Sequence, residues 1–145
     1  MPRATRYLIH VRSTPPAFVV RAPVPKSATS ANSPMMIPRN ILQNADVPPS
    51  GEHFEPLLEI ENVVIERIVS SGSPDPVEYR QKQHEWVLLV KGEATLDVAG
   101  AEVALTAGDY LFLEAGTPHR VTRAAEGSVW LGVHIRGEAA VAITG

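Results

Sequence analysis

The stretch EWVLLVKGEATLDVAGAEVALTAGDYLFLEAGTPHRV, residues 85–121, decides the fold of this chain. Short segments rich in apolar residues follow one another within it, and a glycine separates each segment from the next. Glycine suits tight turns because it adopts backbone conformations that other residues avoid. Short strands that recur every 8–12 residues or so, with glycine turns between them, predict a β-sandwich or a small barrel.

The same pattern continues on both sides of this stretch. We expect strands at residues 57–69, 77–83, 85–91, 93–99, 101–107, 109–115, 119–124 and 128–135. No segment has the periodicity of a long amphipathic helix. The sequence therefore predicts an all-β protein.

Composition narrows the class of protein further. The chain has 145 residues, of which 44% are hydrophobic and 20% charged, and this suits a single globular domain. It has no cysteine, which excludes disulfides and thiolate metal sites. No apolar run approaches the ~20 residues that span a membrane. We expect a cytoplasmic protein without a membrane partner.

Charge divides the chain into a basic leader and an acidic body. Residues 1–44 hold six Lys/Arg and no Asp or Glu, whereas residues 45–145 hold all sixteen acids and a net charge of −9. An acidic body argues against nucleic acid as a partner, because phosphate binding needs a basic surface. We predict three segments. Residues 1–35 are a leader that is either disordered or the product of a misplaced start site, residues 36–55 are an arm, and residues 56–145 are the domain.

The first motif surrounds the strand that begins at Glu85. The spacing E-x6-G runs from Glu85 to Gly92, and Tyr79 and Gln81 stand upstream at alternate positions. This resembles the end of the first cupin motif, G-x5-H-x-H-x3,4-E-x6-G. Tyr79 and Gln81 then occupy the positions of its two histidines.

The second motif follows one strand pair later, in GDYLFLEAGTPHRVTR. This segment resembles the second cupin motif, G-x5-P-x-G-x2-H-x3-N, and matches it at Gly108, Gly116 and His119. It departs from the motif at Glu114 and Arg123, which replace a proline and an asparagine. Both motifs in this order are more specific than either alone.

The resemblance covers about residues 56–136 and implies a double-stranded β-helix, the jelly-roll barrel of the cupins. Cupin barrels hold metals on histidines and one carboxylate. Here the resemblance implies Gln81, Glu85 and His119 as ligands of a divalent metal ion. Oxygen and nitrogen donors without thiolate allow Mn, Fe, Ni or Zn. The alternative is a hydrogen-bonded polar cluster without metal.

Two classes of function remain open. In both, the barrel cavity binds a small polar molecule. The first class is a metal-dependent oxygenase, isomerase or lyase, with Tyr79, Glu85 and His119 as the candidate catalytic residues. The second is a metal-free binding or sensor module without catalysis, because a fold does not fix a function.

Three other polar residues lie near these motifs, and strand parity excludes one of them from the cavity. His84 is adjacent to Glu85, so we expect it to point away from the cavity. Arg123 is in register with His119 and is either a substrate-carboxylate ligand or a surface residue. His134 could lie on either face of its strand.

The strand that begins at Glu85 is apolar on both faces, and one face fills the barrel. The other carries Trp86, Leu88 and Val90, which a lone barrel would leave in water. Such a patch usually marks an interface. We therefore expect a homodimer, unless residues 36–60 cover this face within one chain.

Overall fold

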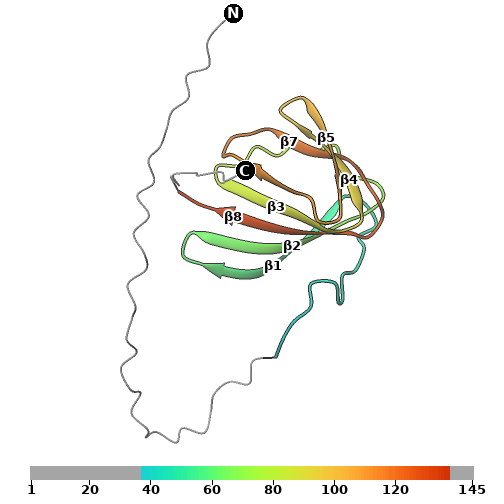
Figure 1. Cartoon of the computed structure of the whole chain (residues 1–145), viewed down its shortest axis with the longest axis vertical. Helices are drawn as coiled ribbons and strands as arrows, with labels where there is room; N and C mark the ends of the chain where they lie inside the picture. Colours follow the sequence, from blue (N-terminus) through green and yellow to red (C-terminus); the bar gives the residue numbers. More distant parts are fainter. Residues whose placement is uncertain (1–36, 138–145) are drawn as a thin grey trace, which may run out of the picture. The chain divides into compact units, whose positions relative to one another are not determined.

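The computed structural model describes residues 37–137, so the predicted leader, residues 1–35, lies outside the described residues, as do residues 138–145. The described residues form eight strands, most of which are labelled in Figure 1: β1 (Glu52–Ile60), β2 (Val63–Ser70), β3 (His84–Lys91), β4 (Glu93–Val98), β5 (Ala101–Thr106), β6 (Tyr110–Leu113), β7 (His119–Ala124) and β8 (Ser128–Ile135). Within residues 37–137 there is no helix, and so none that could cross a membrane.

The strands form two antiparallel sheets (Figure 1). The larger has the order β1-β2-β8-β3-β6, and the smaller has the order β5-β4-β7. Strands far apart in the sequence lie side by side in the larger sheet, where β8 pairs with both β2 and β3. This topology confirms the predicted all-β jelly roll.

The segment predicted as one strand at residues 57–69 is a hairpin of β1 and β2. Glu61 and Asn62 form its turn, and Glu61 has a φ of 51°. Apolar residues are frequent on both sides of these two polar positions, and this concealed the turn. β1 begins at Glu52, inside the segment predicted as an arm.

The prediction of a strand at residues 77–83 is wrong. This segment is irregular, and its only bridge within the described residues joins Tyr79 to His119. The amide of Tyr79 donates to the carbonyl of His119 at 2.8 Å, and the amide of His119 donates to the carbonyl of Tyr79 at 3.0 Å. The amide of Gly116 donates to the carbonyl of Gln81. Pro74 and Pro76 precede the segment, and proline cannot donate to a strand ladder.

The core lies between the two sheets. Glu85, Val87 and Leu89 of β3 are all buried, and Leu89 is 0% exposed. Trp86 and Leu88, on the other face of β3, are only half-buried. This is the predicted division of the strand. The core cluster draws on both sheets: Ile68, Val87, Leu89, Ala94, Leu96, Leu105, Leu113 and Trp130.

A buried arginine anchors the segment before β1. Arg67 is 7% exposed, and its guanidinium donates to the carbonyls of Ile41, Gln43 and Asn44. It also pairs with the carboxylate of Glu55. These partners offset the cost of burying the guanidinium, although its Nε has no partner among the described residues. Part of the predicted arm is thus fixed to β2.

Candidate functional site

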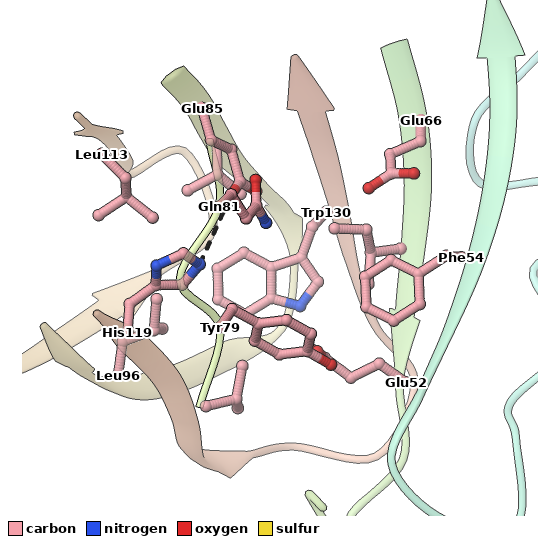
Figure 2. Close-up of a pocket in the computed structure, with 13 residues that line it drawn as sticks. Glu52, Phe54, Glu66, Tyr79, Gln81, Glu85, Leu96, Leu113, His119 and Trp130 are labelled. Carbon is pink, nitrogen blue, oxygen red and sulfur yellow. Dashed lines mark ion pairs between the residues drawn. The ribbon is translucent and has the colours of Figure 1, made fainter. Parts of the chain in front are cut away.

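A cavity of about 50 Å³ opens between the sheets (Figure 2). It is lined by Glu52, Phe54, Glu66, Ile68, Tyr79, Gln81, Glu85, Val87, Leu96, Leu113, His119, Val121 and Trp130. An outer hollow of about 400 Å³ adjoins it and shares Phe54, Glu66, Tyr79 and Gln81 with it. All four residues proposed from the sequence, Tyr79, Gln81, Glu85 and His119, line the inner cavity.

His119 and Glu85 face each other across one side of the cavity. His119 Nε2 lies 3.5 Å from Glu85 Oε2, and both side chains are buried. His119 Nδ1 lies 3.0 Å from the carbonyl oxygen of Thr117, to which it donates, so Nε2 is the nitrogen that faces Glu85. At 3.5 Å the pair is longer than the ~2.8 Å of a strong charged hydrogen bond.

Glu85 Oε2 is buried and has no hydrogen-bond partner among the described residues. Leaving a buried polar atom without a partner costs roughly 1–3 kcal/mol, and more when it carries charge. Burial disfavours the charged imidazole of His119, but the Glu85 carboxylate and the Thr117 carbonyl outweigh it and raise the pKa of His119. The pair is therefore built to share a proton or to accept a donor from a ligand.

The side chain of Gln81 makes its hydrogen bonds with residues other than Glu85 and His119. Its Oε1 lies 3.1 Å from His134 Nδ1 and accepts a hydrogen bond from Gln83 Nε2. The other ring nitrogen of His134 lies 2.7 Å from Glu66 Oε1. Two oxygen acceptors bracket the ring, so both nitrogens donate when His134 is an imidazolium. Hydrogen bonding to Glu66 accordingly raises the pKa of His134.

His134, left open by the sequence, therefore lies on the inner face of β8. It is 8% exposed and lines the outer hollow with Gln83 and Arg136. It shares this face with Trp130, and the alternation of β8 places the two together. Parity alone could not show which face of β8 is inner, because both faces carry large residues.

The donors fit a tightly held metal poorly. No group of three or more His, Asp or Glu side chains within residues 37–137 is arranged to hold a metal ion. His119 Nε2 and Glu85 Oε2 are two good donors that face one space. The third donor implied by the sequence, Gln81 Oε1, is neutral and already bonded to His134 and Gln83. First-row metal sites in proteins commonly use three or four protein ligands.

Four further polar or aromatic residues of the cavity wall were not predicted from the sequence: Glu52, Phe54, Glu66 and Trp130. Trp130 Nε1 donates to Ser70 Oγ at 2.9 Å, and Ser70 Oγ donates to Glu52 Oε1 at 2.9 Å. Burial raises the pKa of Glu52, and the nearby carboxylate of Glu85 adds to this rise. The signal for Glu66 was its parity with Ile68 in β2, which places it on the core face.

Tyr79 contributes a hydroxyl that stays protonated. Burial and the surrounding carboxylates, Glu52 among them, raise its pKa. Its ring stacks on that of His119, with centroids 5.9 Å apart, and meets Phe54 edge-on at 6.2 Å. Tyr79 is therefore a hydrogen-bond donor at neutral pH rather than a base.

His84 and Arg123 lie outside the cavity. His84 Nδ1 accepts the amide of Ala115 at 3.1 Å, and its ring stacks on Phe112. Arg123 is exposed, because an irregularity in the pairing of β4 with β7 turns it outward despite its register with His119. Its possible role as a substrate-carboxylate ligand in the cavity is therefore wrong.

The fold and the motifs agree with comparisons to known proteins. The family model described as Cupin domain matches residues 66–134. The structure of a proposed mannose-6-phosphate isomerase from Ralstonia eutropha JMP134 is 36% identical, with a TM-score of 0.64, and the match covers 70% of this chain and 100% of that chain. The protein therefore belongs to the cupin superfamily.

Two further solved structures share the fold at lower identity. A cupin superfamily protein from Desulfitobacterium hafniense DCB-2 is 17% identical, with a TM-score of 0.61, over 72% of this chain and 94% of that one. The structure of cobalt(II) HppE in complex with substrate is 18% identical, with a TM-score of 0.52, and the match covers 59% of this chain and 52% of that chain. A search of curated proteins gives no match.

The pair of His134 and Glu66 predicts a pH-dependent contribution to stability. The raised pKa of His134 means that folding favours its imidazolium form. The stabilising contribution of the pair is therefore full below pH ~6.5 and is lost as pH rises through the pKa of His134 in the folded protein. We expect Glu66→Gln to lower the free energy of unfolding more at pH 5.5 than at pH 9, measured by urea denaturation. Glu59→Gln, at an exposed carboxylate, is the control. Equal losses for Glu66→Gln at the two pH values would contradict the pairing.

Proposed function

We propose that this cupin binds a small polar molecule in the cavity between its sheets, with Glu85 and His119 as the groups that contact it. The observation that carries the proposal is the buried, unbonded Glu85 Oε2 facing His119 Nε2. A bound donor would satisfy both atoms at once. Tyr79 adds a donor hydroxyl to the same cavity, and Figure 2 shows this hydroxyl directed toward Glu52.

The two-part cavity limits the size of the ligand. A single water molecule needs a cavity of roughly 10–15 Å³. The inner cavity of about 50 Å³ therefore accommodates a head group of only a few heavy atoms. The outer hollow of 400 Å³ can take the remainder of a longer molecule. If the protein is an enzyme, Glu85, His119 and Tyr79 are its candidate catalytic residues, with proton transfer between Glu85 and His119 as the available chemistry.

A sugar phosphate does not suit this cavity, despite the name of the similar Ralstonia structure. No Lys or Arg occurs among the described residues that line the inner cavity, whereas three carboxylates do. The outer hollow has Arg136, but Arg136 is exposed and paired with Glu59. Phosphate recognition usually relies on arginine, lysine or a cluster of backbone amides.

The two tryptophans allow a direct test. Trp130 lines the cavity and Trp86 lies on the outer face, so their indole N–H signals in a ¹⁵N NMR spectrum report inside and outside separately. We expect at least one compound in a set of small polar molecules of each charge to shift the Trp130 signal and leave that of Trp86 in place. Trp86→Phe assigns the two signals.

The same titration with two histidine variants locates the binding site. His119→Ala should weaken binding at least ~10-fold by removing one contact group, whereas His84→Ala should bind as the wild type does. If no compound shifts Trp130, the cavity does not bind small molecules and the proposal is wrong.

A metal-dependent enzyme of the oxygenase, isomerase or lyase type is the second candidate. The observation that favours it is the convergence of Glu85 Oε2 and His119 Nε2 on one space, with Gln81 nearby. With two good donors, Mn, Fe, Ni or Zn would bind weakly, with water or substrate completing the coordination. A bound ion would supply Lewis-acid or redox chemistry.

Calorimetric titration of chelator-treated protein with each divalent metal tests this candidate. We expect weak binding that His119→Ala abolishes and His84→Ala leaves intact, and that falls as pH drops below ~6.5 because neutral imidazole is the ligand. Histidine at positions 79 and 81 should raise the affinity, since imidazole donates better than phenol or amide. Equal binding by the wild type and His119→Ala would rule the site out.

We also propose that the protein is a homodimer through the outer face of the larger sheet. Trp86 and Tyr110 contact each other on this face, with ring centroids 5.4 Å apart, and Tyr110 is 62% exposed. The neighbouring β8 presents Leu131 and Val133 on the same side, half-buried. The alternative was that residues 36–60 cover this face. The segment before β1 is instead anchored at Arg67 by hydrogen bonds, and Tyr110 on β6 stays exposed.

Sedimentation velocity tests the dimer. Leu88→Glu should give a monomer or an insoluble protein, because it places an unpaired charge in buried apolar surface. Lys91→Glu, at an exposed position of the same strand, is the matched control and should leave the dimer intact. A wild-type protein that sediments as a monomer would contradict the interface.

A further inference from the structure

We propose that the molecule bound in the cavity is an organic ammonium ion, with its cationic head seated between Glu52 and Glu85 against the aromatic wall. This inference rests on the proposed function, small-molecule binding in the cavity, and adds the chemical class of the ligand. It follows from the charges, hydrogen bonds and aromatic residues around the inner cavity.

Glu52 has no cationic partner among the described residues, and the cationic partner that Glu85 has there, His119, stands too far away for a strong hydrogen bond. Glu66 is different, because His134 Nε2 lies 2.7 Å from it. Glu52 accepts a hydrogen bond only from the neutral hydroxyl of Ser70 among the described residues. Glu85 Oε2 accepts none, and His119 Nε2 stands 3.5 Å away.

These two carboxylates repel each other, and burial makes the repulsion costly. The charge on Glu85 contributes to the raised pKa of Glu52, after burial itself. A positive charge placed between them would interact favourably with both, whereas a carboxylate or phosphate would add a third like charge to a largely buried space. While His119 is neutral, the cavity thus favours a cation on electrostatic grounds.

Aromatic side chains complete the site. Phe54, Tyr79 and Trp130 line the cavity, and Figure 2 shows the indole of Trp130 amid Glu52, Glu66 and Glu85 in this view. The Ser70 hydroxyl bonds both Trp130 Nε1 and Glu52, so the ring and the carboxylate are held in a fixed relation. Aromatic faces attract organic cations, most strongly in surroundings without water.

This combination separates an organic ammonium ion from an inorganic cation. A strongly hydrated ion such as K⁺ would lose its water against Phe54, Ile68 and Leu113, which offer no oxygen ligands. An alkylammonium ion keeps its apolar part against these residues and directs its N–H groups to the carboxylates. The size of the inner cavity favours a primary ammonium group, with the rest of the molecule extending past Tyr79 into the outer hollow.

Three organic probes of similar size, n-propylammonium, 1-propanol and propionate, test the charge preference, and potassium chloride supplies an inorganic cation. Each is titrated into the full-length wild-type protein at constant ionic strength, and the Trp130 indole signal is followed with Trp86 as the internal reference. We expect n-propylammonium to bind at least ~10-fold more tightly than 1-propanol, and propionate and K⁺ to leave Trp130 unchanged.

Carboxylate variants test the position of the head group. Glu52→Gln should weaken n-propylammonium binding at least ~10-fold while leaving 1-propanol binding within about twofold, because only the charge is removed. Glu59→Gln, an exposed carboxylate on the same strand, should bind as the wild type does. Unchanged n-propylammonium affinity in Glu52→Gln would overturn the proposed seat.

The outcomes distinguish this inference from the proposed function. If 1-propanol or propionate binds as tightly as n-propylammonium, the ammonium inference fails, while small-molecule binding in the cavity stands. If K⁺ shifts Trp130 equally, the cavity takes an inorganic cation and the inference also fails. If neither these probes nor the wider set of small polar molecules shifts Trp130, both proposals fail.

Discussion

The burial of Glu85 on the core face of β3 is the constraint on which the site depends. Val87 and Leu89 follow it on the same face and fill the interior, so the pleat of the strand directs the carboxylate inward as well. Moving an isolated carboxylate out of water costs several kcal/mol. The surroundings reduce that cost in two ways. His119 faces the carboxylate of Glu85, and the cavity leaves space for a ligand to supply the missing hydrogen bond.

The second support of the site is the short bridge between Tyr79 and His119. It fixes an otherwise irregular segment to β7 by two backbone hydrogen bonds, and it brings the Tyr79 and His119 rings into a stack. Gln81 is fixed close by through its carbonyl, which accepts the amide of Gly116. The side chains of an irregular segment thus become part of the cavity wall without a strand to hold them.

The charged groups of the site fall into two sets. In the first set, both ring nitrogens of His134 are hydrogen-bonded, to Glu66 and Gln81, and this network is closed. In the second set, Glu85 and His119 are close but incompletely bonded, and Glu52 has only a hydroxyl donor among the described residues. The closed network contributes to the folded structure, whereas the incomplete one has unused capacity for a ligand. Proteins with this fold differ in function because such local arrangements differ.

The sequence by itself determined the fold class, most strand positions and four cavity residues. Period-two alternation in β3 is a local property, so the inward direction of Glu85 and the outward direction of His84 could be predicted before any contact was known. The motif spacing then brought Tyr79, Gln81 and His119 to the same cavity. Tyr79 and Gln81 were placed correctly even though their segment is not a strand.

Only the tertiary structure decided which of these residues have partners. Glu52 and Phe54 reach the cavity because β1 pairs with β2, and the facing of His134 depends on which side of β8 meets the smaller sheet. The pairing irregularity that turns Arg123 outward depends on contacts between β4 and β7. The side-chain oxygen of Gln81 is hydrogen-bonded to His134, 53 positions away, so it is not free to bind a metal. Alternation fixes direction along one strand, but hydrogen-bond partners come from strands distant in sequence, and no local pattern records them.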